Sequence, residues 1–141
     1  MMRSSVIAIG VALVLAACTV QTEQTSAPIK TYGNISVADL KKRLDSGEKL
    51  LLLDVRTARE FGGQLGHLDG ATLIPVQELE ERIGELKGFM SGEIMVYCRS
   101  GNRSKTASEI LTNHGFRATN VVGGMKAWNA MMAVDNKKKR D

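Results

Sequence analysis

The stretch Ile94–Leu111, IMVYCRSGNRSKTASEIL, changes from one backbone pattern to another within a few residues. It opens with a short continuous apolar run, which is typical of a strand that is buried on both faces. It closes with Ala107, Ile110 and Leu111 at helical spacing, and this helical pattern ends at Gly115. A strand that passes through a short loop into a helix is the repeating unit of a parallel α/β sheet.

The rest of the chain repeats this alternation of strands and helices. Further strands are predicted at 50–54 (LLLLD), 71–75 (ATLIP) and 119–122 (TNVV), and further helices at 36–47, at 76–86 and from 124 (GMKAW) onward. The strands are apolar throughout, which favours burial between two layers of helices. The sequence therefore predicts an α/β fold with a mainly parallel central sheet flanked by helices.

Cys98 lies at the carboxyl end of its predicted strand, where parallel sheets bind their ligands. Polar residues, basic residues and one glycine fill the loop before the helix: Arg99, Ser100, Gly101, Asn102 and Arg103. Such a loop is expected to turn its N–H groups inward and to stabilise an anion. We expect that anion to be the thiolate of Cys98, with a pKa low enough for nucleophilic attack without a histidine base. The alternative, a buried inert cysteine, fits a polar loop poorly.

Four segments of the chain, taken in order, resemble the signatures of the rhodanese family. They are DVRTAREF (54–61), GHLDGATLIP (66–75), CRSGNRS (98–104) and GGMKAW (123–128). The resemblance implies a rhodanese-like three-layer sandwich and transfer of sulfane sulfur through a persulfide on Cys98. It further implies that the N–H groups of residues 99–103 hold the outer sulfur. Arg99 or Arg103 would steer an anionic donor of the thiosulfate or polysulfide class, and a thiol or another nucleophile would accept the sulfur.

Asp54 and Arg56 stand at the end of the predicted strand 50–54, which neighbours the cysteine strand. The carboxylate of Asp54 is expected to pair with Arg99 or Arg103 and to hold the loop in shape. The alternative is that Asp54 only caps the turn that follows it. These residues are therefore candidates for supporting the loop rather than for the chemistry itself.

Two other features surround the expected site. Ser104, which closes the cysteine motif, is assigned a loop-supporting role, and Glu60 is expected to pair with Arg56.

Between Phe61 and Gly66 stand four residues, GGQL, which is more than the family commonly has there. They border the expected site, so we expect them to alter the shape of the pocket mouth.

The N-terminal segment MMRSSVIAIGVALVLAAC, residues 1–18, has the layout of a secretory signal. Arg3 precedes an apolar run, 6–17, that is shorter than the roughly 20 residues of a membrane span. The end of this run, LAAC at 15–18, resembles the lipobox of bacterial lipoproteins, in which the chain is cut before a cysteine that then carries lipid. The alternative is an ordinary signal peptide with an incidental Cys18.

The resulting organisation has one folded domain between two flanking segments. We expect a lipoprotein signal peptide at 1–17, a lipidated Cys18 with a flexible tether at 18–33, a rhodanese domain at 34–131 and a basic tail at 132–141. The protein would be lipid-anchored in a bacterial cell envelope, facing the periplasm or the exterior. The resemblance to lipoproteins implies that, in a bacterium with two membranes, Thr19 in place of aspartate favours the outer membrane over the inner one.

The charge distribution limits the partners. The formal net charge is +4, and three lysines, one arginine and one aspartate at 137–141 supply +3 of it. A nearly neutral body does not favour nucleic acid. The tail is expected to be frayed and solvated, with a weak contact to anionic lipid as the alternative. We expect a monomer without a cofactor. We also expect no metal, because His67, His114 and Cys98 are not at ligand spacing.

Three other functions compete with small-molecule sulfur transfer. Four residues separate Cys98 from Arg103, a shorter spacing than in tyrosine phosphatases, so the loop suits one sulfur atom better than a phosphate. A non-catalytic binding module on the same scaffold would need neither the cysteine nor its loop. A carrier that passes sulfur to a protein partner shares the persulfide chemistry, and the sequence does not separate it from the enzyme.

Overall fold

A computed structural model describes residues 31–141 of the chain. The predicted signal peptide, the lipidation site Cys18 and most of the predicted tether lie outside the described residues. Five strands form one sheet: β1 (Gly33–Ile35), β2 (Leu51–Asp54), β3 (Thr72–Leu73), β4 (Glu93–Tyr97) and β5 (Arg117–Val121). Their order is β1-β5-β4-β2-β3 and every pairing is parallel, which confirms the predicted sheet.

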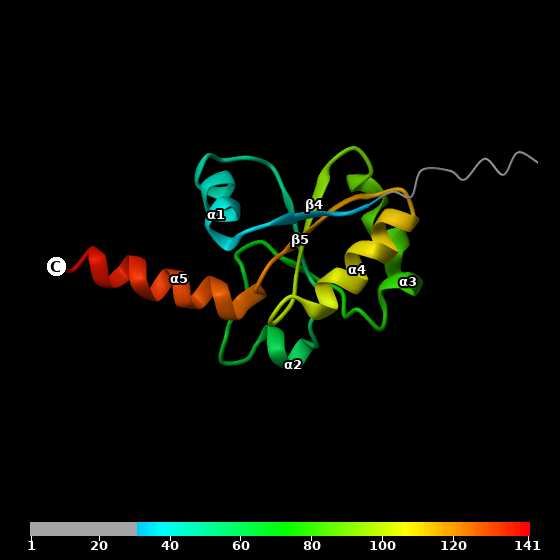
Figure 1. The fold of residues 1–141 in the computed structure, drawn as a ribbon. Coiled ribbons are helices and arrows are strands. Elements are labelled where there is room, and N and C mark those ends of the chain that lie inside the picture. Colours follow the sequence, from blue (N-terminus) through cyan, green and yellow to red (C-terminus); the bar gives the residue numbers. More distant parts are fainter. Residues whose placement is uncertain (1–30) are drawn as a thin grey trace, which may run out of the picture.

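Helices cover both faces of this sheet. They are α1 (Val37–Asp45), α2 (Ala58–Phe61), α3 (Leu79–Arg82), the 3₁₀ helix η1 (Ile83–Phe89), α4 (Asn102–Asn113) and α5 (Gly124–Lys138). Figure 1 shows α1 and α5 on one side of the strands and α3 and α4 on the other. The three-layer α/β arrangement predicted from the sequence is therefore confirmed.

Two hydrophobic clusters, one on each face, explain why the strands read as continuous apolar runs. Leu51 and Leu53 of β2 point into the cluster beneath α3, η1 and α4, whereas Leu52 points into the cluster beneath α1 and α5. Val96 and Tyr97 of β4 divide in the same way. Successive side chains of a strand face opposite sides, so burial on both sides requires every position to be apolar.

Three local elements differ from the sequence prediction. The first strand, β1, was not expected, and it begins at Gly33, one residue inside the predicted tether. The single helix predicted at 76–86 is instead the short α3 followed by η1, because Gly84 and Gly88 weaken an α-helix. The short helix α2 was also not expected; a capping box between Thr57 and Glu60 stabilises it.

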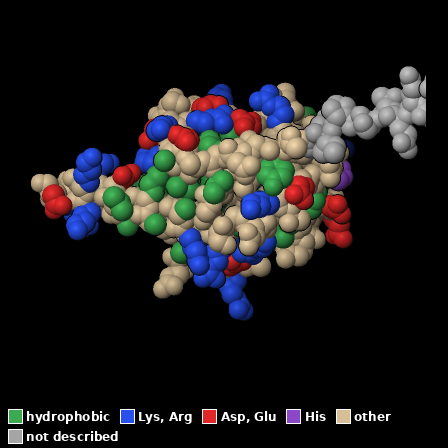
Figure 2. Space-filling view, in the orientation of Figure 1, with side chains coloured by type: hydrophobic (Ala, Val, Ile, Leu, Met, Phe, Trp, Pro, Cys, Tyr) green, Lys and Arg blue, Asp and Glu red, His purple; other side chains and the backbone are tan. Residues whose placement is uncertain are grey.

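Helix α5 continues past the predicted boundary at 131 and ends at Lys138, so most of the tail expected to be frayed is helical. Good helix formers at 130–133 (AMMA) carry the helix onward, and Lys137 and Lys138 in the last turn interact favourably with its dipole. Beyond Met125 no residue of α5 is fully buried. Figure 1 shows the helix projecting from the body, and Figure 2 shows basic side chains on both sides of its free end. Within residues 31–141, no helix has the length and apolar character needed to span a membrane.

Candidate active site

Cys98 directly follows β4, the middle strand of the sheet, and its side chain is only 1% exposed. Its Sγ accepts a hydrogen bond from the backbone N–H of Gly101 at 3.1 Å. The hydroxyl oxygen of Ser104 lies 3.5 Å from the same sulfur. Gly101 has φ = +106°, a left-handed conformation that lets the loop close before α4 begins at Asn102. The expected cradle of donors around the cysteine is therefore present.

This surrounding determines the charge state of the thiol. Burial is the largest single effect on the pKa of Cys98 and acts to raise it, because a charged sulfur loses its hydration. The Ser104 hydroxyl opposes this effect, together with backbone N–H groups of Ser104, Gly101 and Ser100. The donors outweigh the burial, so the pKa of Cys98 lies below its usual value, in the direction that the sequence predicts. The site thus stabilises the thiolate relative to that of a free cysteine.

The beginning of α5 holds the cysteine loop from behind. The N–H of Met125 donates to the Cys98 carbonyl at 2.9 Å, and the N–H of Lys126 donates to the Arg99 carbonyl at 3.0 Å. In a trans peptide the C=O and N–H point in opposite directions, so these bonds turn the N–H groups of Arg99 and Ser100 away from α5. The sequence analysis did not predict this contact, although the residues that make it belong to the GGMKAW motif.

Gly124 makes that close approach possible. Its φ is +53°, and a Cβ at this position would stand 2.3 Å from the Cys98 carbonyl oxygen. No side chain fits there without moving the backbone of either the loop or the helix. The second glycine of GGMKAW is therefore required by packing against the site.

Asp54 and Arg56 form a buried ion pair with each other, 2.6 Å between Oδ2 and Nη2. This corrects the expected pairing of Asp54 with Arg99 or Arg103. Asp54 also accepts the backbone N–H of Arg56 at 3.0 Å, so it caps the following turn, as the alternative held. Asp54 and Arg56 are only two residues apart, and the turn between them places their side chains in contact. Arg56 also donates to the Gly66 carbonyl at 2.7 Å and so fixes the 62–66 segment.

Glu60 pairs with Arg103 rather than with Arg56, which corrects the second expected ion pair. Two parallel hydrogen bonds of 2.7 Å join the carboxylate to the guanidinium. The hydrogen bonds from Arg103 lower the pKa of Glu60 to about 2. The pair ties α2 to the first turn of α4, because Arg103 extends from α4 and Glu60 lies in α2 directly after the β2 turn. The charge of Arg103 is therefore compensated.

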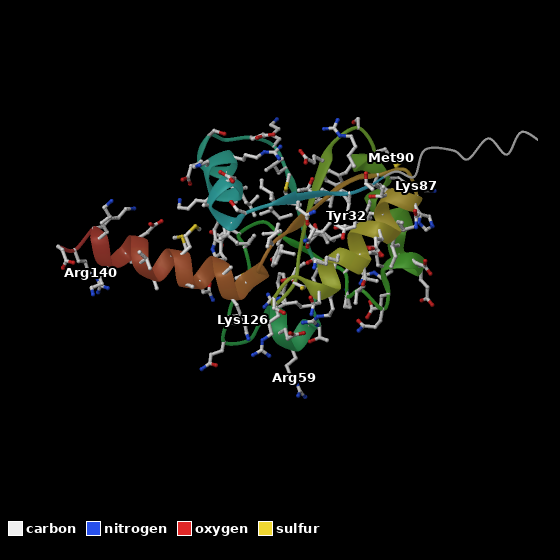
Figure 3. The ribbon with its side chains drawn as sticks, in the orientation of Figure 1. Tyr32, Arg59, Lys87, Met90, Lys126 and Arg140 are labelled. Carbon is white, nitrogen blue, oxygen red and sulfur yellow. The ribbon has the colours of Figure 1, made fainter. Side chains whose placement is uncertain are left out.

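A cleft of about 260 Å³ opens beside the loop. Its lining includes Arg56, Arg59, Glu60, Gln64, Leu65 and Arg99. The GGQL segment thus borders the site, as expected, and Asn129 of α5 donates to the Leu65 carbonyl at 3.0 Å to hold it. Arg59 and Arg99 have no ion pair within the described residues. Figure 3 shows Arg59 extending from α2 and Lys126 at the start of α5.

The two histidines have structural surroundings. His67 stacks on Phe61 with ring centroids 3.7 Å apart, and its Nδ1 lies 3.0 Å from the Phe61 carbonyl oxygen. His114 directly follows α4 as its C-cap, and its Nδ1 lies 2.9 Å from the Ile110 carbonyl oxygen. In the part of the chain that the structure describes, no three His, Cys, Asp or Glu side chains come together as metal ligands.

The chain is thus a parallel α/β protein in which a cysteine, held by hydrogen-bond donors, follows the middle strand of the sheet. The family model described as "Rhodanese-like domain" matches residues 36–131, and the chain belongs to this family. A crystal structure of a rhodanese-like domain protein from Staphylococcus aureus has the same fold, with a TM-score of 0.63 and 30% identity. The match covers 68% of this chain and 90% of that chain.

Relatives of this chain are named for handling sulfur. The Bacillus subtilis protein named "Putative sulfur carrier protein YrkF" is 36% identical over 107 residues, which is 75% of this chain and 56% of YrkF. The chain therefore spans little more than half of that relative. The Bacillus subtilis protein named "Putative sulfurtransferase YtwF" is 36% identical over 94 residues, which is 67% of this chain and 87% of YtwF. One name thus refers to sulfur carriage and the other to sulfur transfer.

Proposed function

We propose that this protein is a sulfurtransferase that carries sulfane sulfur as a persulfide on Cys98. The donor is a small anion of the thiosulfate or polysulfide class, and the acceptor is a thiol or another nucleophile. The observation that carries the proposal is the Cys98 sulfur itself, buried among backbone and hydroxyl donors that lower its pKa. A lowered pKa increases the fraction of thiolate at neutral pH, and the thiolate is the nucleophilic form of cysteine.

The reaction has two displacement steps. The Cys98 thiolate attacks the outer sulfur of thiosulfate, an S–S bond to Cys98 forms, and the bond to the sulfonate sulfur breaks as sulfite leaves with its electron pair. The negative charge then rests on the outer persulfide sulfur, which the N–H groups of the loop stabilise. The acceptor attacks this outer sulfur, takes it away and returns the thiolate. Each step is a displacement at sulfur, so no external oxidant or reductant is consumed.

The direct functional test is steady-state transfer from thiosulfate to cyanide by the purified protein. The proposal expects sulfite and thiocyanate to appear in equal amounts. Failure with thiosulfate and also with polysulfide would favour a non-catalytic binding module on the same scaffold. Turnover only in the presence of a protein thiol would support a protein-partnered carrier; the name of YrkF also refers to a sulfur carrier.

Arg99 is the residue that we assign to steering the anionic donor. It is exposed, lines the cleft and lacks an ion pair within the described residues, whereas Arg103 is paired with Glu60. Arg99→Ala is expected to raise the KM for thiosulfate roughly tenfold and to change kcat little, because it removes a charged contact to the bound donor. The measurement is the dependence of turnover on thiosulfate concentration.

Arg117→Ala is the matched control for that substitution. Arg117 is also an exposed arginine, but it lies at the start of β5. In a parallel sheet this places it at the amino-terminal ends of the strands, whereas Cys98 lies at their carboxyl ends. Its removal is expected to leave the KM unchanged. An Arg99→Ala protein with the wild-type KM would contradict the steering role.

The proposed location is a bacterial cell envelope, where the protein acts as a monomer anchored by lipid on Cys18. The support is the sequence at 1–18, with its apolar run ending in LAAC. Cys18→Ala is expected to move the protein from the membrane fraction to the soluble fraction, because a lipid anchor needs the cysteine thiol. Membrane fractionation of cells that express each form measures this. A Cys18→Ala protein that stays with the membrane contradicts lipidation.

A further inference from the structure

The hydroxyl of Ser104 lies among three acceptors but has one proton to donate. Its Oγ is 3.5 Å from Cys98 Sγ, 3.1 Å from the Gly101 carbonyl oxygen and 2.7 Å from Asn120 Oδ1. A hydroxyl donates one hydrogen bond and accepts through two lone pairs. The three acceptors compete for this proton. While the sulfur is a neutral thiol, the shortest contact, to Asn120, is favoured, and Cys98 then faces an Oγ lone pair. That arrangement suits a protonated thiol, which can donate to Oγ.

Asn120 extends this contact away from the site. Its side chain is 1% exposed in β5, and its Nδ2 donates to Asn34 Oδ1 at 2.9 Å. Asn34 lies opposite Asn120 in the edge strand β1 and is exposed. A hydrogen-bonded chain therefore runs from the buried sulfur through Ser104 and Asn120 to the protein surface. Sequence reasoning did not single out Asn120; the feature that indicated it was an amide side chain inside a strand predicted to be buried.

The direction of this chain is reversible. An amide turned by 180° exchanges its oxygen and its NH₂ group without changing its shape. With the NH₂ of Asn120 facing Ser104, the hydroxyl accepts from Asn120 and its proton is free to point at Sγ. Asn34, being exposed, can turn its own amide to match, so every donor in the chain keeps an acceptor. That second arrangement suits a thiolate or a persulfide anion, which needs a donor.

We propose that Asn120 is a positioning residue: its amide orientation directs the Ser104 proton toward the Cys98 sulfur when the sulfur is negatively charged and away from it when the thiol is protonated. The inference deepens the proposed function, in which Cys98 cycles between thiolate and persulfide. The thiol proton itself leaves to solvent. A fixed donor would serve only the charged form, whereas this chain serves both.

The charged groups around the cysteine loop stay constant when Asn120 is changed. They are Arg99 in the loop, Arg103 in α4, Glu60 in α2, Asp54 and Arg56 at the end of β2, and Lys126 in α5. Two of the arginines are neutralised by partners, in the pairs Asp54–Arg56 and Glu60–Arg103. β5 contributes the uncharged Asn120, so replacing it with another uncharged residue leaves the local charge unaltered.

The test is the pH dependence of alkylation of Cys98 by iodoacetamide in the full chain, followed on the peptide that contains Cys98 by mass spectrometry. Asn120→Leu removes the NH₂ group that would donate to the Ser104 oxygen in the thiolate arrangement, so the Ser104 proton is no longer directed at Sγ and is shared with the Gly101 carbonyl oxygen. The thiolate loses a donor, so the alkylation midpoint is expected to rise by about one pH unit. In a Ser104→Ala background the same substitution is expected to cause no shift, because Asn120 acts only through Ser104.

Ser108→Ala is the matched control for Ser104→Ala. Ser108 is one turn further along α4 and fully buried, and its Oγ has no partner within the described residues. Its removal should leave the midpoint unchanged. If Asn120→Leu does not fold, Asn120→Ala enters the same comparison. A wild-type midpoint in the Asn120 variant, or an equal shift with and without Ser104, overturns the proposal. Alkylation does not require sulfur transfer, so these outcomes stay distinct from failure of the proposed function.

Discussion

Cys98→Ser is expected to reduce sulfur transfer from thiosulfate to cyanide by at least about a thousandfold. The serine hydroxyl is not ionised at neutral pH and forms no persulfide, so both displacement steps lose their nucleophile. The fold should survive, because oxygen is smaller than sulfur and can still accept the N–H of Gly101. The free energy of unfolding is expected to change by no more than about 2 kcal/mol. Turnover and denaturant unfolding, measured on the same preparation, check both parts.

Cys18→Ser is the control for this experiment, because it removes the other cysteine of the chain. It is expected to keep full turnover in a purified protein. Residual transfer by Cys98→Ser near the wild-type rate would mean that another group carries the sulfur. The proposed mechanism would then be wrong, whatever the fold.

Gly124→Ala is expected to have the second-largest effect. Its Cβ would lie 2.3 Å from the Cys98 carbonyl oxygen and 2.9 Å from the Arg99 carbonyl carbon, and both are backbone atoms. The start of α5 has to move away, which breaks its hydrogen bonds to the loop and releases the inward orientation of the loop N–H groups. The free energy of unfolding should fall by roughly 2–4 kcal/mol. Turnover should fall at least about tenfold, because the loop loses donors for the charged sulfur.

Gly47→Ala separates the steric effect at Gly124 from the cost of the backbone angle. Gly47 also has a positive φ, +76°, but a Cβ there meets no atom within 4 Å. It should lower the free energy of unfolding by about 1 kcal/mol and leave turnover unchanged. Equal effects of the two substitutions on turnover and unfolding would show that α5 does not hold the cysteine loop.

The parts of the fold that could be predicted are those determined by burial. Continuous apolar runs such as 50–54 and 94–97 predict strands covered on both faces, and the structure places them at the centre of the sheet. The cysteine cradle was also predictable, since a strand end, a glycine and a helix start follow one another in the chain. Strand β1 was not, because three residues at a sheet edge carry too little pattern.

The ion pairs around the site were predicted less well than the cysteine loop. Which residues pair depends on the positions of the charged groups in the folded protein, and the order of residues in the sequence does not specify those positions. Asp54 turns to the nearby Arg56, which leaves Arg103 to Glu60. The role of Gly124 was likewise hidden, because it arises from a contact between segments that lie far apart in the chain. In both cases the residues were recognisable, but their contacts required the three-dimensional structure.

The persulfide on Cys98 is tested by the mass of the Cys98 peptide after the purified protein has been exposed to thiosulfate, measured before and after mild treatment with a thiol. Cys98 is expected to gain one sulfur atom that the thiol removes. A gain of two oxygens has nearly the same mass, but a sulfinate survives the thiol. If Cys98 is unmodified after exposure to thiosulfate and then to polysulfide, the protein does not carry sulfur as a persulfide on this residue.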